Sequence, residues 1–130
     1  MTDCSVQIAL LESAARTVTI ACPKQQHYAC RAIRLYLSVT VAVAGTGGLQ
    51  PIIRGYDLIS GNTVSLSTGG TAIVAVGTYV YEMGLGLLST AKQGNIEECQ
   101  NRPAPVQWDV SIAVGDATSY TYSLSAEVLT

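Results

Sequence analysis

The clearest feature of this chain is a strict alternation of apolar and polar side chains from Arg34 to Ala44. Successive side chains of a β-strand point to opposite faces, so a period of two residues predicts a long strand with one face on a core. This pattern favours an antiparallel β domain. The predicted core face comprises Leu35, Leu37, Val39, Val41 and Val43, and the opposite face comprises Arg34, Tyr36, Ser38, Thr40 and Ala42.

The same period returns near the C-terminus in two stretches, Val106–Val114 and Tyr120–Val128. Gly115 and Asp116 begin a turn between them, so a final pair of strands is predicted. Thr121, Ser123, Ser125 and Glu127 occupy the predicted outer face of the second stretch. The predicted core faces comprise Val106, Trp108, Val110, Ile112 and Val114 in the first stretch, and Tyr120, Tyr122, Leu124, Ala126 and Val128 in the second.

The N-terminal residues 1–31 predict a hairpin or arm. Cys4, Val6, Ile8 and Leu10 alternate with smaller or polar residues in a first strand, and Arg16–Ala21 alternates in a second. A turn within residues 11–15 would join the two as a hairpin. Pro23 ends the second strand because proline has no N–H for a ladder, and a polar loop follows.

Three further strands are predicted in the middle of the chain: Leu49–Leu58, Asn62–Leu66 and Thr71–Met83. Pro51 and Gly55 interrupt the first of these, which is typical of an edge strand or a bulge. The sequence Ser60-Gly-Asn predicts a tight turn, and Gly77 predicts a bend or a split in the third strand.

Residues 84–105 lack periodicity and include the most polar part of the chain, so a long exposed loop is predicted there. The full pattern amounts to about eight strands without a helix, which indicates a two-layer sandwich or jelly roll. With no repeat or linker, residues 1–130 are expected to form a single-domain, all-β antiparallel sandwich.

The low content of charged residues indicates that this domain associates with other proteins. Only 12% of the residues are charged, against about 25% in ordinary soluble domains. Such a surface of Ser, Thr and Gly resists association poorly, which favours a protein whose faces are covered by partners. A monomeric sheet with Ser and Thr on its outer face is the alternative.

The net charge of −2 and the scattered Lys and Arg residues exclude several partners. No basic stripe is present that would bind nucleic acid, and no polybasic patch would bind a membrane. No apolar run has the length of a membrane span, and the N-terminus lacks the pattern of a secretory leader. The chain is therefore expected to be made and kept in a cytosol.

The four cysteines, Cys4, Cys22, Cys30 and Cys99, contain no Cys-x-x-Cys pair. Reduced thiols are the expectation for a cytosol, with a Cys22–Cys30 disulfide as the alternative. Together with His27, the cysteines at 22, 30 and 99 have the right chemistry for zinc, but their spacing is unlike the usual zinc motifs. No metal or cofactor is expected.

The sequence also gives little evidence for a set of catalytic residues. His27 is the single histidine, lies in a polar loop and has no Gly-x-Ser-x-Gly motif to act with. Glu97 and Glu98 are adjacent and would diverge rather than flank a scissile bond. The glycine-rich stretches 45–48 and 84–86 lack the Lys-Ser/Thr of a phosphate loop. No catalytic residue is predicted, and the remaining acids are interpreted as solubilising charges at strand ends or outer faces: Asp57, Glu82, Asp109 and Asp116.

Tyrosines form two i, i+2 pairs, Tyr79 with Tyr81 and Tyr120 with Tyr122. Exposed, such pairs and Trp108 would stack on sugars, as in a carbohydrate-binding module. Because the chain has no Phe, tyrosine and tryptophan are the large aromatic residues available to the core. A place in the core or in a subunit interface is the favoured interpretation.

Three passages carry a family resemblance: Arg54–Gly61, Gly77–Gly84 and Trp108–Leu129. Together with Leu35–Val43 they resemble small β-sandwich virion proteins of tailed bacteriophages, namely head decoration or cement proteins and related minor structural components. The resemblance covers Arg31–Leu129, whereas the first thirty residues and the cysteines depart from it.

The resemblance implies a non-enzymatic protein on the capsid surface, made in the host cytoplasm. Such a protein bridges capsid subunits and stabilises the shell. Its expected partners are the major capsid protein and other copies of itself, as a homotrimer. A neck or tail component of the virion is the alternative within the same family.

Overall fold

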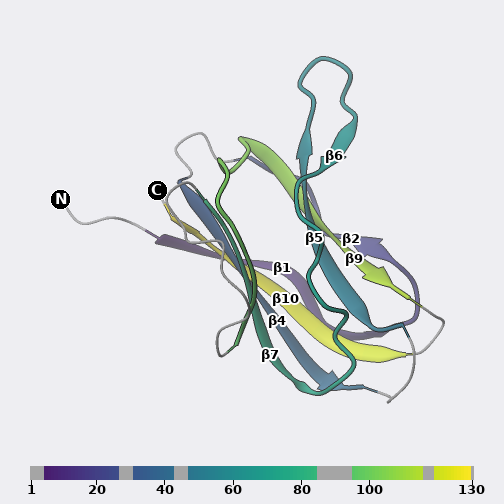
Figure 1. The fold of residues 1–130 in the computed structure, drawn as a ribbon. Helices are drawn as coiled ribbons and strands as arrows, with labels where there is room; N and C mark the ends of the chain where they lie inside the picture. Colours follow the sequence, from purple (N-terminus) through teal and green to yellow (C-terminus); the bar gives the residue numbers. More distant parts are fainter. Residues whose placement is uncertain (1–4, 27–30, 43–46, 85–94, 116–118, 130) are drawn as a thin grey trace.

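The computed structural model describes residues 5–26, 31–42, 47–84, 95–115 and 119–129, and these form ten strands without a helix. The strands make two sheets that face each other as the two layers of a sandwich (Figure 1). The predicted all-β sandwich is therefore confirmed, with ten strands rather than eight. All pairings are antiparallel except that of β7 with β8.

In order across the first sheet, the strands are β1 (Ser5–Arg16), β10 (Tyr120–Leu129), β4 (Ala32–Val41), β7 (Gly77–Gly84) and β8 (Ile96–Gln100). The second sheet has the order β2 (Ile20–Ala21), β9 (Gln107–Val114), β5 (Leu49–Tyr56) and β6 (Thr63–Ser65), with β3 (Gln25–Gln26) also pairing with β9.

Alternation in β4 produces the core face that its sequence predicts. Leu35, Leu37 and Val39 are buried, but the predicted core residue Val41 is exposed. The pairing with β10 explains this, because Val39 lies opposite Tyr122 whereas Val41 lies opposite the next residue, Thr121. The extra residue is a β-bulge, which reverses the faces beyond it. Val43 lies outside the described residues.

Strands β9 and β10 have the predicted faces but do not pair with each other. Trp108, Val110 and Ile112 of β9 are buried, as are the five predicted core residues of β10. However, β9 pairs with β2, β3 and β5 in one sheet, while β10 pairs with β1 and β4 in the other. The two strands therefore belong to different layers, although they are neighbours in the sequence. Val106 precedes β9 and is exposed.

The predicted N-terminal hairpin is wrong. Strand β1 continues through the expected turn to Arg16 and pairs with β10 along its whole length, whereas β2 belongs to the other sheet. Register shifts between Ala9 and Leu11 and between Leu11 and Ala14 mark bulges. Because bulges absorb extra residues and increase twist, one long strand can carry a segment whose alternation is broken. Val6, at the outer end of this edge strand, is exposed.

Strand β8 was missed by the sequence pattern. It lies inside the predicted loop 84–105 and pairs in parallel with β7, while residues 85–94 are outside the described part. All five β8 residues are half-buried, so the strand shows no alternation of apolar and polar positions. Gly77 does split the predicted strand 71–83, because β7 begins there and Ile73 before it forms only an isolated bridge to Leu49.

β5 lies between β9 and β6, so it is not the edge strand that Pro51 suggested, but β6 pairs only with Arg54–Tyr56 and leaves Pro51 without a described ladder partner on that side. The N–H groups of Leu49 and Ile53 donate away from β9, to the carbonyl oxygen of Ile73 and to Ser67 Oγ, both at 2.9 Å. The nitrogen of Pro51, between them, faces the same side. Proline therefore removes no bond from the β5–β9 ladder.

Gly48 is a position where both backbone angle and space require glycine. Its φ is +90°, and an added Cβ would lie 2.8 Å from the Ile73 carbonyl oxygen and 2.9 Å from Val74 Cγ1. We expect Gly48→Ala to lower the free energy of unfolding by roughly 2 kcal/mol, measured by urea unfolding. Gly61→Ala is the control, because Gly61 has φ +77° but open space around it. Equal losses in the two variants would exclude the close contact as a cause.

Candidate functional site

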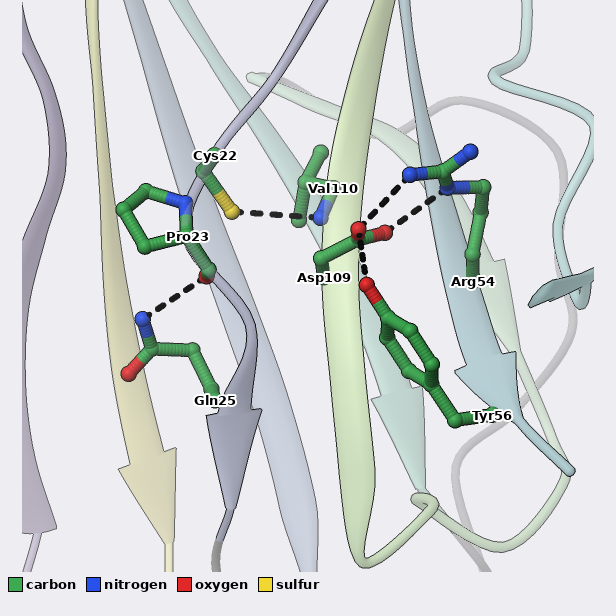
Figure 2. A network of polar contacts seen from close by, with 7 residues as sticks. All are labelled: Cys22, Pro23, Gln25, Arg54, Tyr56, Asp109 and Val110. Carbon is green, nitrogen blue, oxygen red and sulfur yellow. Dashed lines mark hydrogen bonds and ion pairs between the residues drawn. The ribbon is translucent and has the colours of Figure 1, made fainter. Parts of the chain in front are cut away.

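A buried ion pair lies at the root of the β5–β6 hairpin. Arg54 of β5 lies directly opposite Asp109 of β9, and its Nε and Nη2 donate to the two carboxylate oxygens at 2.7 and 2.6 Å. Tyr56 donates its hydroxyl to Asp109 Oδ2 at 2.7 Å (Figure 2). We call these three residues the root network. It joins β5 and β9 by side chains as well as by their backbone ladder.

The low exposure of the root network indicates that it has a structural role. The Asp109 side chain is 3% exposed and that of Arg54 24% exposed, so the prediction of Asp109 as a solubilising charge is wrong. Its position does lie on the outer face of β9, but Arg54 and Tyr56 cover it. The hydrogen bond to Asp109 raises the pKa of both Arg54 and Tyr56. Both carboxylate oxygens already accept hydrogen bonds, which suits a charge held in place rather than a general base.

Cys22 lies beside this network as a free, buried thiol. Its Sγ accepts a hydrogen bond from the Val110 N–H at 3.2 Å (Figure 2). Its own N–H donates to the Val110 carbonyl at 3.0 Å. Burial raises the pKa of the thiol, which keeps it protonated and unreactive. Cys22 thus acts as a small core residue, as expected for a reduced cysteine.

The two described members of the zinc set considered from the sequence lie beside different sheets. Cys22 directly follows β2 of the second sheet, and Cys99 is a free thiol on β8 at the edge of the first. His27 and Cys30, like Cys4, lie outside the described residues. Within the described ranges, no group of three or more His, Cys, Asp or Glu side chains is placed to hold a metal ion.

A second ion-pair network crosses the outer face of the first sheet. Arg34 of β4 donates to Glu82 of β7 at 2.6 Å and to Glu127 of β10 at 3.2 Å, and Tyr36 donates to the same Glu127 oxygen. Because these residues lie opposite one another in the register, the network links three neighbouring strands. Glu82 is therefore part of the sheet's outer face, as expected, and is paired there.

The other candidate acids have structural partners or lie outside the described part. Glu98 of β8 accepts a hydrogen bond from Thr68, and its neighbour Glu97 is half-buried on the same strand. Asp57 accepts hydrogen bonds within a turn, and these lower the pKa of its carboxyl group. Asp116 is not among the described residues. Glu82 and Glu127 both bind Arg34 on the face of a sheet, so they are neutralised by a cation rather than free to act across a scissile bond.

The tyrosines belong to the core rather than to a sugar-binding surface. Tyr81, Tyr120 and Tyr122 are buried together with Trp108. Tyr79 is half-buried and donates its hydroxyl to the Ala75 carbonyl at 2.8 Å. The favoured interpretation of these residues is confirmed, because buried rings cannot stack on a sugar.

The most exposed apolar side chains of the described residues gather at the end of the β5–β6 hairpin, which projects beyond the sandwich (Figure 1). Leu58 is 73% exposed and Ile59 is 98% exposed. We call these two residues the apolar tip. The sequence placed Leu58 at the end of a strand and did not single out Ile59, although two aliphatic residues before Ser60-Gly-Asn are an unusual turn composition.

Comparisons with known proteins add little. No family model matches the chain, and no curated protein matches it. Among solved structures, it is similar to a chain in the structure of infectious bursal disease virus, Gx strain, with a TM-score of 0.49 and 13% identity. That match covers 99% of this chain but only 32% of the other, so the chain spans about a third of its neighbour's length. Similarity at this level establishes neither a shared family nor a shared function.

The described part of the chain also holds no helix with the length and apolarity needed to cross a bilayer. The main features of the described part are thus two ion-pair networks, a buried apolar core and one projecting apolar tip. None of these groups offers a free nucleophile beside a base.

Proposed function

We propose that this protein is a non-enzymatic virion structural protein of a tailed bacteriophage, acting as a capsid decoration protein on the outside of the head. One observation carries the proposal. The described ion pairs join neighbouring strands to one another, whereas the hairpin presents exposed aliphatic side chains that have no such partner within the described part of the chain. The passages that resemble phage virion proteins support the same assignment.

The proposed mechanism is adhesive. Copies of the chain, as a homotrimer, bind the major capsid protein and bridge neighbouring subunits. Each contact is modest, but a trimer that engages several subunits gains affinity through effective concentration, and the shell gains resistance to heat. The weakly charged faces suit contacts of this kind because little charge must be desolvated on binding. Nucleic acid and membrane are not partners, and the protein reaches the capsid surface after synthesis in the host cytoplasm.

Binding to expanded capsids of the parent phage tests the proposal. We expect saturable binding at a fixed copy number that matches the capsid lattice, measured by quantitative densitometry of purified particles. Particles that lack the protein should lose infectivity at a lower temperature than complete ones. A ring of roughly six or twelve copies would instead place the protein at the neck or tail. Its absence from normal particles would end the proposal.

A further inference from the structure

The apolar tip carries a sharper inference, which rests on the proposed function. We propose that Leu58 and Ile59 are the anchor of this protein and insert into an uncharged, apolar cavity of the capsid subunit. Exposed aliphatic residues cost solubility, so a conspicuous pair at the end of a projecting hairpin is best explained by a partner that buries it.

The turn holds the anchor in one shape before binding. Asp57 accepts hydrogen bonds from the Ile59 N–H at 3.1 Å and from the Ser60 hydroxyl at 2.7 Å. Its own N–H donates to the Asn62 carbonyl at 2.9 Å, and the Gly61 N–H donates to the Asp57 carbonyl at 2.8 Å. Because the loop is already ordered, burying the two side chains costs little conformational entropy.

The root network fixes the direction in which the hairpin projects. Arg54 and Tyr56 are the last outward-facing residues of β5 before the turn, and both are bound to Asp109 on the neighbouring strand. β6 pairs with the same three-residue end of β5, from Arg54 to Tyr56. The tip is therefore carried on a braced two-stranded stalk rather than on a free loop.

The composition of the outer end of the hairpin, residues 57–64, indicates what kind of surface it binds. Asp57 is the single charged residue between Tyr56 and Ser65, and both of its carboxylate oxygens serve the turn. The receiving surface thus needs to match aliphatic groups and backbone, not charge. Binding driven by apolar burial should depend only weakly on salt.

A second copy of this chain offers a poor binding surface for the tip. Two cavities lie on its described surface. One of about 290 Å³ is lined by Gln7, Tyr36 and Ser125 together with Ile8, Ala9 and Ala126, and one of about 200 Å³ is lined by Thr71, Tyr79 and Glu97 together with the apolar residues 72–75. Each cavity mixes polar with apolar groups, so aliphatic side chains inserted there would cover polar groups without replacing their hydrogen bonds to water.

The small area of the tip also argues against a second copy of the chain as its partner. Two aliphatic side chains bury far less than the roughly 800 Å² per partner of a stable two-protein interface. The tip alone would not hold a free dimer together. It can contribute to a multivalent attachment in which several copies bind one shell.

The experiment compares three proteins in binding to expanded capsids of the parent phage. The first is the wild type, and the second is Leu58→Ser/Ile59→Ser. The third is the control Val18→Ser, which alters a 65% exposed valine outside the hairpin. We expect the double variant to bind at least about 30-fold more weakly and the control to bind normally. Wild-type affinity should change less than about threefold when salt rises tenfold.

Circular dichroism and light scattering distinguish the possible outcomes. The double variant should keep the wild-type spectrum, melting temperature and molar mass, because the substituted side chains have few contacts. Wild-type affinity in such a folded variant would overturn the anchor and leave the proposed function standing. A molar mass lower than that of the wild type would also overturn the anchor, because it would show that the tip binds a second copy of the chain. Failure of the wild type to bind capsids would defeat the proposed function itself.

Discussion

Replacing Trp108 by alanine is expected to lower the free energy of unfolding by roughly 4 kcal/mol. Trp108 is fully buried on β9 and belongs to the single core between the sheets. Removing the indole loses its burial and leaves a cavity that the surrounding strands cannot fill, since each is held in register by its ladder. Of the substitutions considered, this one removes the most buried volume.

Circular dichroism in urea is the appropriate measurement, because Trp108 is the chain's one tryptophan and its fluorescence is lost in the variant. A loss of that size approaches the total stability of a marginal domain, about 5–15 kcal/mol, so low yield of folded protein is also expected. Val106→Ala, at an exposed position just before the strand, serves as the control. A loss for Trp108→Ala as small as that of the control would contradict the burial of the indole.

The Asp109→Ala variant should lose roughly 3 kcal/mol of unfolding free energy, from a broken pair rather than from a cavity. The substitution leaves the guanidinium of Arg54 and the hydroxyl of Tyr56 without their shared acceptor. The loss lies at the low end for buried pairs because Arg54 is partly exposed and can turn towards water. Urea unfolding of this variant and of Glu12→Ala, an exposed acid on β1, provides the comparison.

A double variant tests whether the loss arises from the unpaired charge. In Arg54→Met/Asp109→Leu, both partners become apolar groups of similar size, which removes the uncompensated cation. We therefore expect the double variant to recover most of the stability lost in Asp109→Ala. If it is as unstable as the single variant, shape at this position matters more than charge pairing. The thermodynamic cycle completed by the single variants Arg54→Met and Asp109→Leu then measures the coupling directly.

Local periodicity explains which parts of the fold were predictable. β4 and β10 show their buried faces in the sequence, because one face packs on the core from Ile33 to Val39 in β4 and along the whole of β10. β8 shows no such pattern, since its position at the end of the sheet leaves every side chain half-buried. The bulge beside Val41 was equally invisible, because it depends on the register with β10 and not on the residue itself.

The candidate site was less predictable than the fold. The alternation of β9 places Asp109 on the outer face, where an exposed charge is expected. It is nevertheless buried, because Arg54 and Tyr56 of the neighbouring strand β5 cover it. Ile59 sits beside a predicted turn, but its exposure depends on how far the β5–β6 hairpin extends beyond the other sheet.

The amino-acid sequence alone determined that this protein is built from strands, most of the side chains by which β4, β9 and β10 form the core, and that Tyr81, Tyr120 and Tyr122 belong to that core. These follow from side-chain direction, which repeats every two residues along any strand. Tertiary structure decided the partners: β1 with β10 instead of β2, β9 and β10 in opposite layers, and Asp109 under Arg54. Strand pairing joins residues far apart in the chain, and its energy depends on closing the whole sandwich, which no local pattern encodes.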